Sequence, residues 1–167
     1  TCLHVNNETG VIQPIEGMGR ILEESGSPAF FHVDAVQSFA KLPVDPVKWH
    51  VDLLSASAHK FHGPKGIGCL YVRRGLTISP LIRGGGQERK MRSGTENVPG
   101  IVGMGQAVQE AAEDLTGHSA YVQKLKLYLW ERIQKEIPEV WTNGPVPEEG
   151  APHVLNVRFQ DVRSEVL

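Results

Sequence analysis

Lys60 is the residue of this sequence whose surroundings best suit covalent chemistry. Ser55 to His59 precede it and a glycine- and proline-rich stretch, 63–68, follows it. Short apolar runs at 52–54 and 69–72 predict two buried strands joined by a tight connection that carries Lys60. We therefore expect a partly desolvated Lys60 whose neutral amine attacks a carbonyl to form a Schiff base. A solvated lysine before a Gly-Pro turn is the open alternative, because the local motif is weak.

A carboxylate follows another strand-like run. The β-type segment 29–33 ends at Asp34, and 35–38 predicts the start of a short helix. Strand ends are where α/β folds place ligand groups. Asp34 with Gln37 three residues on is also a capping-box pattern, which only satisfies helix N–H groups. The position of Asp34 therefore fits either a helix cap or a residue that contacts a ligand.

Four motifs, taken together and in order, resemble the pyridoxal-phosphate (PLP) cysteine desulfurases of the NifS/IscS type. They are His4 to Gly10, His32 to Gln37, Ser55 to Gly68, and Gly84 to Arg89 continuing through Arg92 to Asn97. The resemblance is strong to about residue 115 and looser beyond, where it includes Asn143-Gly144 and Asn156-Val157.

The resemblance implies an α/β chain of PLP-dependent transferase fold type I, the aspartate aminotransferase-like fold. Residues 1–115 are then the C-terminal part of the large PLP-binding domain. Residues 116–167 are the connecting helix and the beginning of a truncated small domain.

Two residues take the central roles that the resemblance implies. Lys60 matches the lysine that holds PLP covalently and then moves the Cα proton of the substrate. Asp34 matches the carboxylate facing the pyridine nitrogen, where a negative charge keeps that nitrogen protonated.

The remaining matches surround the cofactor. Gln37 and Asn7 match amides near its phenolate oxygen, and Asn7 also lies near the substrate carboxylate. Ser57 and His59 match the phosphate-binding residues, as hydrogen-bond donors to a dianion. Thr95 matches a threonine that reaches the phosphate of the neighbouring subunit, which implies a homodimer.

The activity implied is cysteine desulfuration, which gives L-alanine and an enzyme persulfide from L-cysteine. The sulfur passes to an acceptor or scaffold protein for iron–sulfur cluster assembly or thiolation. Selenocysteine lyase shares these motifs, and a non-catalytic PLP-fold module is the alternative of another class. Neither Cys2 nor Cys69 matches the mobile thiol of the family. We expect that thiol, the carboxylate-binding arginine and the cofactor-stacking group outside this chain, which alone is then an inactive internal fragment.

Other ligands fit these residues less well. His4, His32, His50, His59 and His62 lack the spacing of a zinc site, so we expect no metal. The Gly84 to Gly86 run with basic neighbours lacks the ending of a P-loop and the interleaved aromatics of a single-strand binder, so we expect no nucleic acid.

Composition is that of a globular domain: 167 residues, 40% of them hydrophobic, with a net charge of −2. No apolar run is long enough for a membrane span and no signal pattern opens the sequence. We expect a cytoplasmic protein in which both cysteines are reduced, buried and unpaired.

Several elements must position these residues. We expect helices over 15–25, 97–115 and 121–137, and strands near 139–142 and 153–159. Thr116 to Ser119 separates the last two helices and is the expected domain boundary. The apolar residues expected to be buried are Val98, Ile101, Val102, Val108, Ala111, Ala112 and Leu115 on one helix and Val122, Leu125, Leu129, Ile133 and Ile137 on the other.

Overall fold

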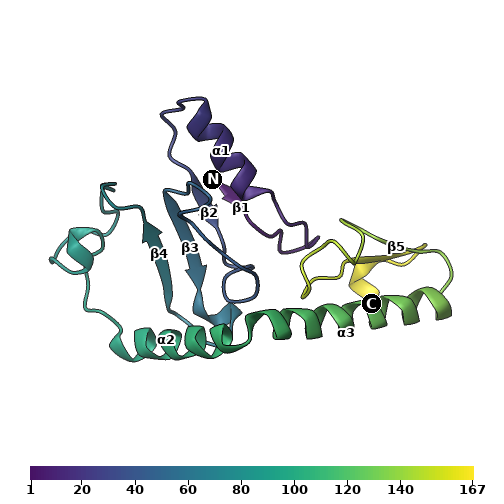
Figure 1. Cartoon of the computed structure of the whole chain (residues 1–167). Coiled ribbons are helices and arrows are strands. Elements are labelled where there is room, and N and C mark those ends of the chain that lie inside the picture. Colours follow the sequence, from purple (N-terminus) through teal and green to yellow (C-terminus); the bar gives the residue numbers. More distant parts are fainter.

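The computed structural model describes residues 1–167, which form a four-stranded sheet, three helices and a separate two-stranded sheet (Figure 1). The larger sheet contains β1 (Cys2–Leu3), β2 (His32–Asp34), β3 (Leu53–Ser57) and β4 (Gly68–Val72). The helices are α1 (Ile15–Glu24), α2 (Val98–Glu113) and α3 (Leu115–Glu136). The smaller sheet pairs β5 (Val140–Thr142) with β6 (Val157–Phe159). Single 3₁₀ turns occur at Ala58–Lys60, Glu88–Lys90 and Ser164–Val166. None of the helices combines the length and the apolar character that crossing a membrane requires.

The larger sheet brings three strand ends to one edge. Its order is β1-β2-β3-β4, with the first three strands parallel and β4 antiparallel to β3. Asp34, the last residue of β2, pairs with Leu3 on one side and Ser55 on the other. Because these strands are parallel, the segments that leave their carboxyl ends all begin at the same edge.

Two buried clusters support that edge. Ile15 of α1 packs with Val33 and Leu54 of the sheet in the larger cluster. Along β3, Leu54 and Ala56 are buried and the alternate residues are more open, as expected for a strand with one face on the core. The second cluster joins Ala58 and Phe61 to Met104 and Ala107 of α2, so this helix supports the turn that follows β3.

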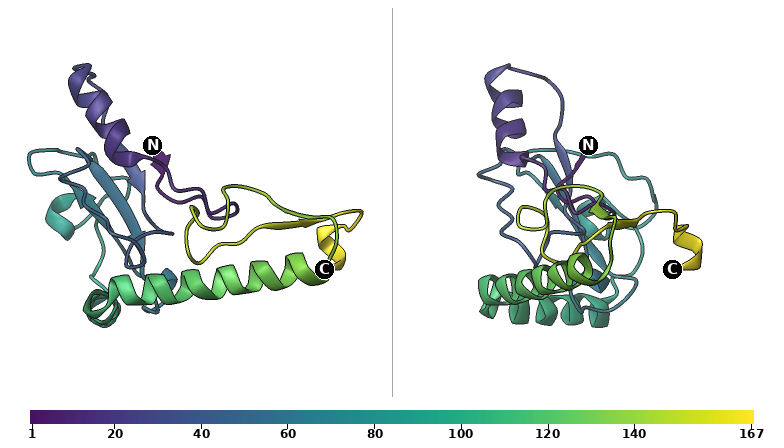
Figure 2. Two further views of the ribbon diagram at one scale, coloured as in Figure 1. Left: turned by 45° about the vertical axis from the view of Figure 1, so that its right-hand side comes forward. Right: turned by 90° about the vertical axis from the view of Figure 1, so that its right-hand side faces the viewer.

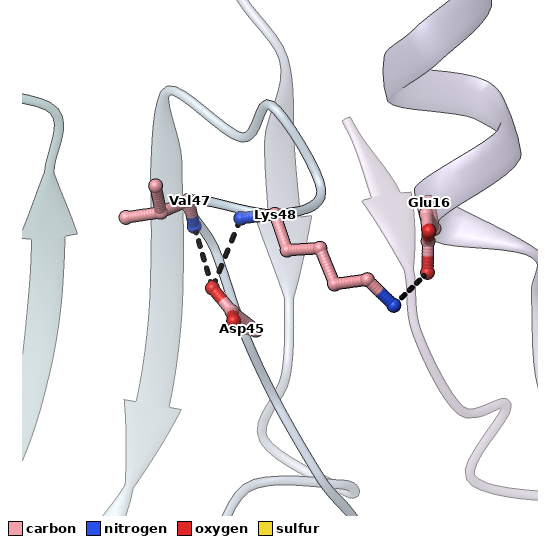
Figure 3. Close-up of polar contacts among 4 residues, drawn as sticks. All are labelled: Glu16, Asp45, Val47 and Lys48. Atoms are coloured by element: carbon pink, nitrogen blue, oxygen red, sulfur yellow. Dashed lines mark hydrogen bonds and ion pairs between the residues drawn. The ribbon is translucent and has the colours of Figure 1, made fainter.

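The turn 45–50 lies against α1 (Figure 3). Asp45 Oδ1 accepts hydrogen bonds from the backbone N–H groups of Val47 and Lys48, and Lys48 Nζ forms a 2.9 Å ion pair with Glu16. Both charged partners are exposed, so the pair contributes only about 0.2–1 kcal/mol. The backbone of α1 also packs directly against this turn at Gly19, where an added Cβ would overlap the Trp49 carbonyl oxygen. Close backbone packing at Gly19 therefore positions α1.

Two helical expectations need correction. Residues 35–38 form a hydrogen-bonded turn and not the start of a helix. Residues 116–119, expected to separate two helices, lie inside α3. The interruption is the single residue Asp114, whose φ of −147° leaves the helical region and whose Oδ1 accepts from Gly117 N–H at 3.0 Å. An aspartate N-cap therefore restarts the helix immediately.

The buried faces of α2 and α3 are also not the expected ones. The buried residues are Gly100, Met104 and Ala107 on α2, and Lys126 and Trp130 on α3. Seven residues expected to be buried are exposed, namely Val98, Ile101, Val102, Ala112, Leu125, Leu129 and Ile137. Apolar residues cover more than one side of each helix, so their spacing does not decide which side is buried.

The strand β4 differs from the expected buried interior strand. It is an edge of the sheet, and the residues Gly68 to Leu70 are exposed. Cys69 is therefore exposed and Cys2 is partly buried, which corrects the expectation that both are buried. Both thiols are unpaired, as expected.

The helix α3 leads from the larger sheet to the smaller one (Figure 1). The loop after β1 extends toward the smaller sheet and lies beside the segment that joins β5 to β6 (Figure 2). Ala151 N–H donates to Gly10 O at 2.8 Å, so the two parts of the chain are in direct contact.

Candidate functional site

Lys60 ends a 3₁₀ turn that follows β3 directly. Ala58 and Phe61, on either side of the exposed pair His59 and Lys60, are buried. Gly63 N–H donates to Ala58 O at 2.9 Å, and a Cβ on Gly63 would lie 2.7 Å from that of Ala58. The chain thus fixes the backbone of Lys60 while leaving its side chain outside the core.

The expected desolvation of Lys60 is wrong for this chain, because its side chain is exposed. It lines one wall of an open cavity of about 480 Å³ at the carboxyl edge of the sheet. The cavity lies between the Lys60 turn, the junction of α2 with α3, and Pro152-His153. Of the residues expected to bind the cofactor, Lys60 alone lines this cavity.

Ser57 and His59 form a pair beside Lys60. Ser57 Oγ and His59 Nδ1 lie 3.1 Å apart, within hydrogen-bond distance. With the hydroxyl as the donor, the imidazole proton stays on Nε2, so the exposed ring offers an N–H group outward. This arrangement suits an anion.

Asp34 lies at the same edge of the sheet, at the end of the neighbouring strand. Its Oδ1 accepts from Val36 N–H at 2.9 Å, two residues on, and not from the N–H that a capping box would use. Gln37 is half-buried in the turn that Asp34 begins. Part of the carboxylate thus shapes the turn, and Asp34 remains partly open to solvent.

Asn7 reaches this edge from β1. It lies exposed in the turn from Asn6 to Gly10, in which Asn6 Oδ1 accepts from the N–H groups of Glu8 and Thr9. The side-chain oxygen of Asn6 is thus satisfied within the turn, and the exposed side-chain amide of the turn is that of Asn7.

The structure does not bring Thr95 into this group within one chain. Thr95 is exposed on the segment between β4 and α2, which extends away from the sheet on the side opposite β5 (Figure 1). Ser93 N–H and Oγ both donate to Ile82 O, at 3.2 and 3.1 Å, so the segment is folded on itself.

Three residues of the cavity were missed by the sequence reasoning. Lys41, His118 and His153 line it together with Lys60. No motif marks them, because they come from three separate segments that meet only in the folded chain. His153 is the most perturbed of them: burial, and then the charges of Lys41, Lys126 and Lys60, lower its pKa to about 4.

The depressed pKa of His153 makes stability depend on pH. In the unfolded chain the pKa of His153 is the ordinary histidine value of 6.5, whereas in the folded chain it is about 4. Stability contributed by neutral His153 is therefore complete above pH 6.5 and is lost as the pH falls toward 4. We expect His153→Gln to reduce the loss of unfolding free energy between pH 7 and pH 5, as measured by urea denaturation.

His118→Gln is the matched control for that measurement, because His118 is exposed on the rim of the same cavity. An unchanged pH dependence in His153→Gln would contradict the assignment.

A larger cavity, of about 810 Å³, lies at the other end of the sheet, near Phe31, Val51 and Tyr71. None of the residues expected to bind the cofactor lines it. Nor do the histidines gather with other potential ligands into a group of three.

The residues at the carboxyl edge fit PLP by their chemistry. An exposed amine, a partly open carboxylate and a hydroxyl–imidazole pair lie on adjacent segments: Lys60, Asp34, Ser57 and His59. An aldehyde, a pyridinium nitrogen and a phosphate call for these three kinds of group.

Comparison with known proteins gives one consistent result. The family described as aminotransferase class-V matches residues 1–167. Cysteine desulfurase IscS of Photorhabdus laumondii is 50% identical over 167 residues, which are 99% of this chain and 40% of that protein. The chain therefore spans about two fifths of the length of this curated relative.

Solved structures agree. A NifS-like protein has a TM-score of 0.91 at 43% identity, over 98% of this chain and 44% of that one. SspA in complex with cysteine has a TM-score of 0.74 at 40% identity, over 95% of this chain and 42% of that one.

Proposed function

The chain belongs to the aminotransferase class-V family, and on that basis we propose that its protein is a PLP-dependent cysteine desulfurase. Membership and the NifS-like neighbours confirm the expected α/β fold, PLP-dependent fold type I. The reaction proposed converts L-cysteine and an enzyme thiol into L-alanine and an enzyme persulfide. The Cβ–S bond breaks, and the sulfur joins the thiolate of a cysteine other than Cys2 and Cys69.

The observation that carries this proposal is the pairing of β2 with β3. It puts Asp34 opposite Ser55, next to the segment that ends in Ser57, His59 and Lys60. When bound, PLP supplies a ring that accepts electron density from the Cα of an amino acid. Lys60 would hold the aldehyde carbon and, once free, move the proton at Cα.

The other residues bind and orient in this proposal. Asp34 would keep the pyridine nitrogen protonated, and Ser57 Oγ and the outward N–H of His59 would donate to the phosphate. Gln37 and Asn7 would donate to the phenolate oxygen. The exposed amide of Asn7 also suits the carboxylate of the substrate.

We also propose a homodimer in which Thr95 reaches the phosphate of the partner's cofactor. The Thr95-bearing segment extends from the sheet and exposes Leu81 and Ile82, with relative exposures of 96% and 52%. A second copy of the chain would cover these apolar side chains. The domain division at residue 115 remains part of this proposal.

The cellular setting follows from the reaction. A persulfide needs an acceptor or an iron–sulfur scaffold protein to receive its sulfur. The two unpaired thiols fit a reducing compartment, so we propose the cytoplasm.

The test is an assay of the full-length protein with L-cysteine and, in parallel, L-selenocysteine, each with a thiol reductant. We expect alanine and sulfide in equal amounts from cysteine. Turnover of selenocysteine alone would make the protein a selenocysteine lyase. Bound PLP with turnover of neither substrate would identify a non-catalytic module.

A further inference from the structure

The turn that carries Asn7 is held from inside by Asn6. Asn6 Oδ1 accepts from Glu8 N–H at 3.0 Å, Thr9 N–H at 2.9 Å and Thr9 Oγ1 at 3.0 Å. Gly10 N–H donates to Asn6 O at 3.0 Å. These bonds fix the shape of the turn, but they do not fix where the turn lies relative to Lys60.

A distant segment holds the turn from outside. Asn156 Nδ2 donates to Glu8 O at 3.1 Å, across 148 residues of sequence. Gly144 lies so close that a Cβ there would be 2.6 Å from Thr9 O. With the bond from Ala151 to Gly10, consecutive residues of the turn, Glu8 to Gly10, each contact this segment.

Asn156 is itself held at the start of the smaller sheet. Its Oδ1 accepts from Asn143 Nδ2 at 3.0 Å, and its backbone O accepts from Asn143 N–H at 3.0 Å. The adjacent residues, Thr142 and Val157, are paired in the sheet. The side-chain amide of Asn156 therefore has a fixed orientation: its Oδ1 accepts from Asn143, and its Nδ2 donates to Glu8 O.

We propose that Asn156 is a positioning residue that acts through Glu8 to set where the Asn7 amide lies in the site. Asn156 lies at the start of the smaller sheet, so this contact ties that sheet to the site at the edge of the larger one. The catalytic part of this inference rests on the proposed function, whereas the anchoring of the turn does not.

The first experiment measures hydrogen exchange of the full-length protein and needs no turnover. In Asn156→Ala we expect the amides of Thr9 and Gly10 to exchange about three- to tenfold faster. In Asn156→Asp we expect at least as large an increase, because a carboxylate oxygen replaces the donor that faces Glu8 O. Gln160→Ala is the matched control, since this amide, just beyond β6, bonds only to neighbouring Asp161. Unchanged exchange at the turn in Asn156→Ala would overturn the proposal.

The second experiment is a double-mutant cycle with Asn7→Ala, which uses cysteine turnover. We expect Asn156→Ala to raise KM about three- to tenfold with a smaller change in kcat, because one hydrogen bond is lost. In the Asn7→Ala background the same substitution should change KM less than about twofold. Equal effects in both backgrounds would show that Asn156 does not act through Asn7. If the wild-type protein does not turn over cysteine, the proposed function is refuted. The hydrogen-exchange experiment would still decide whether Asn156 anchors the turn.

Discussion

Lys60→Ala in the full-length protein should lower cysteine turnover by at least about 10⁴-fold, since covalent attachment and proton transfer at Cα are lost together. The visible absorbance of the PLP adduct should disappear as well. The fold should survive, because Lys60 is exposed and the buried residues Ala58 and Phe61 hold its turn. Absorbance spectra and an assay for alanine measure the two effects.

Lys65→Ala is the matched control, since Lys65 is an exposed lysine of the same glycine-rich stretch. Borohydride reduction of the wild-type protein followed by peptide mapping adds an independent readout. A label on any lysine other than Lys60 would refute the assignment.

Asp34→Asn should lower kcat by about 10²- to 10³-fold while PLP remains bound. Asparagine removes the charge proposed to keep the pyridine nitrogen protonated. It keeps an oxygen that can accept from Val36 N–H, as Asp34 Oδ1 does at 2.9 Å, so the turn should stay intact. Steady-state kinetics and the PLP content of the purified variant measure the result.

Asp45→Asn is the matched control for the loss of charge. Asp45 also accepts backbone N–H groups with its Oδ1, but in the turn beside α1 (Figure 3). It should keep wild-type kcat. Wild-type turnover in Asp34→Asn would exclude the role assigned to that carboxylate.

Local sequence signals were sufficient for the elements that carry the site. A β-type run ending at Asp34 and another ending before Lys60 predict strand ends, and the structure has β2 and β3 there, paired in parallel. Asp34 and Lys60 therefore come to one edge. The strand expected near 139–142 is confirmed as β5, and that near 153–159 is confirmed over its last part, β6.

Features that depend on tertiary contacts could not be predicted in this way. The exposure of Lys60 depends on what covers its side chain, and the buried face of α2 depends on where Ala58 and Phe61 meet it. The bond from Asn156 to Glu8 joins residues with no local relation in sequence. His153 likewise enters the cavity only through folding.

Asp114 is the single non-helical residue between α2 and α3, so its backbone conformation sets the direction of the longer helix, α3. A helix of 22 residues is about 33 Å long, so a tilt of about 5° at Asp114 displaces its far end by about 3 Å. In the middle of α3, Lys126 Nζ donates hydrogen bonds to Gly150 O and Ala151 O, at 3.1 and 3.0 Å. Ala151 N–H in turn donates to Gly10 O, so the direction in which α3 leaves Asp114 determines where the segment that contacts the Asn6 to Gly10 turn lies.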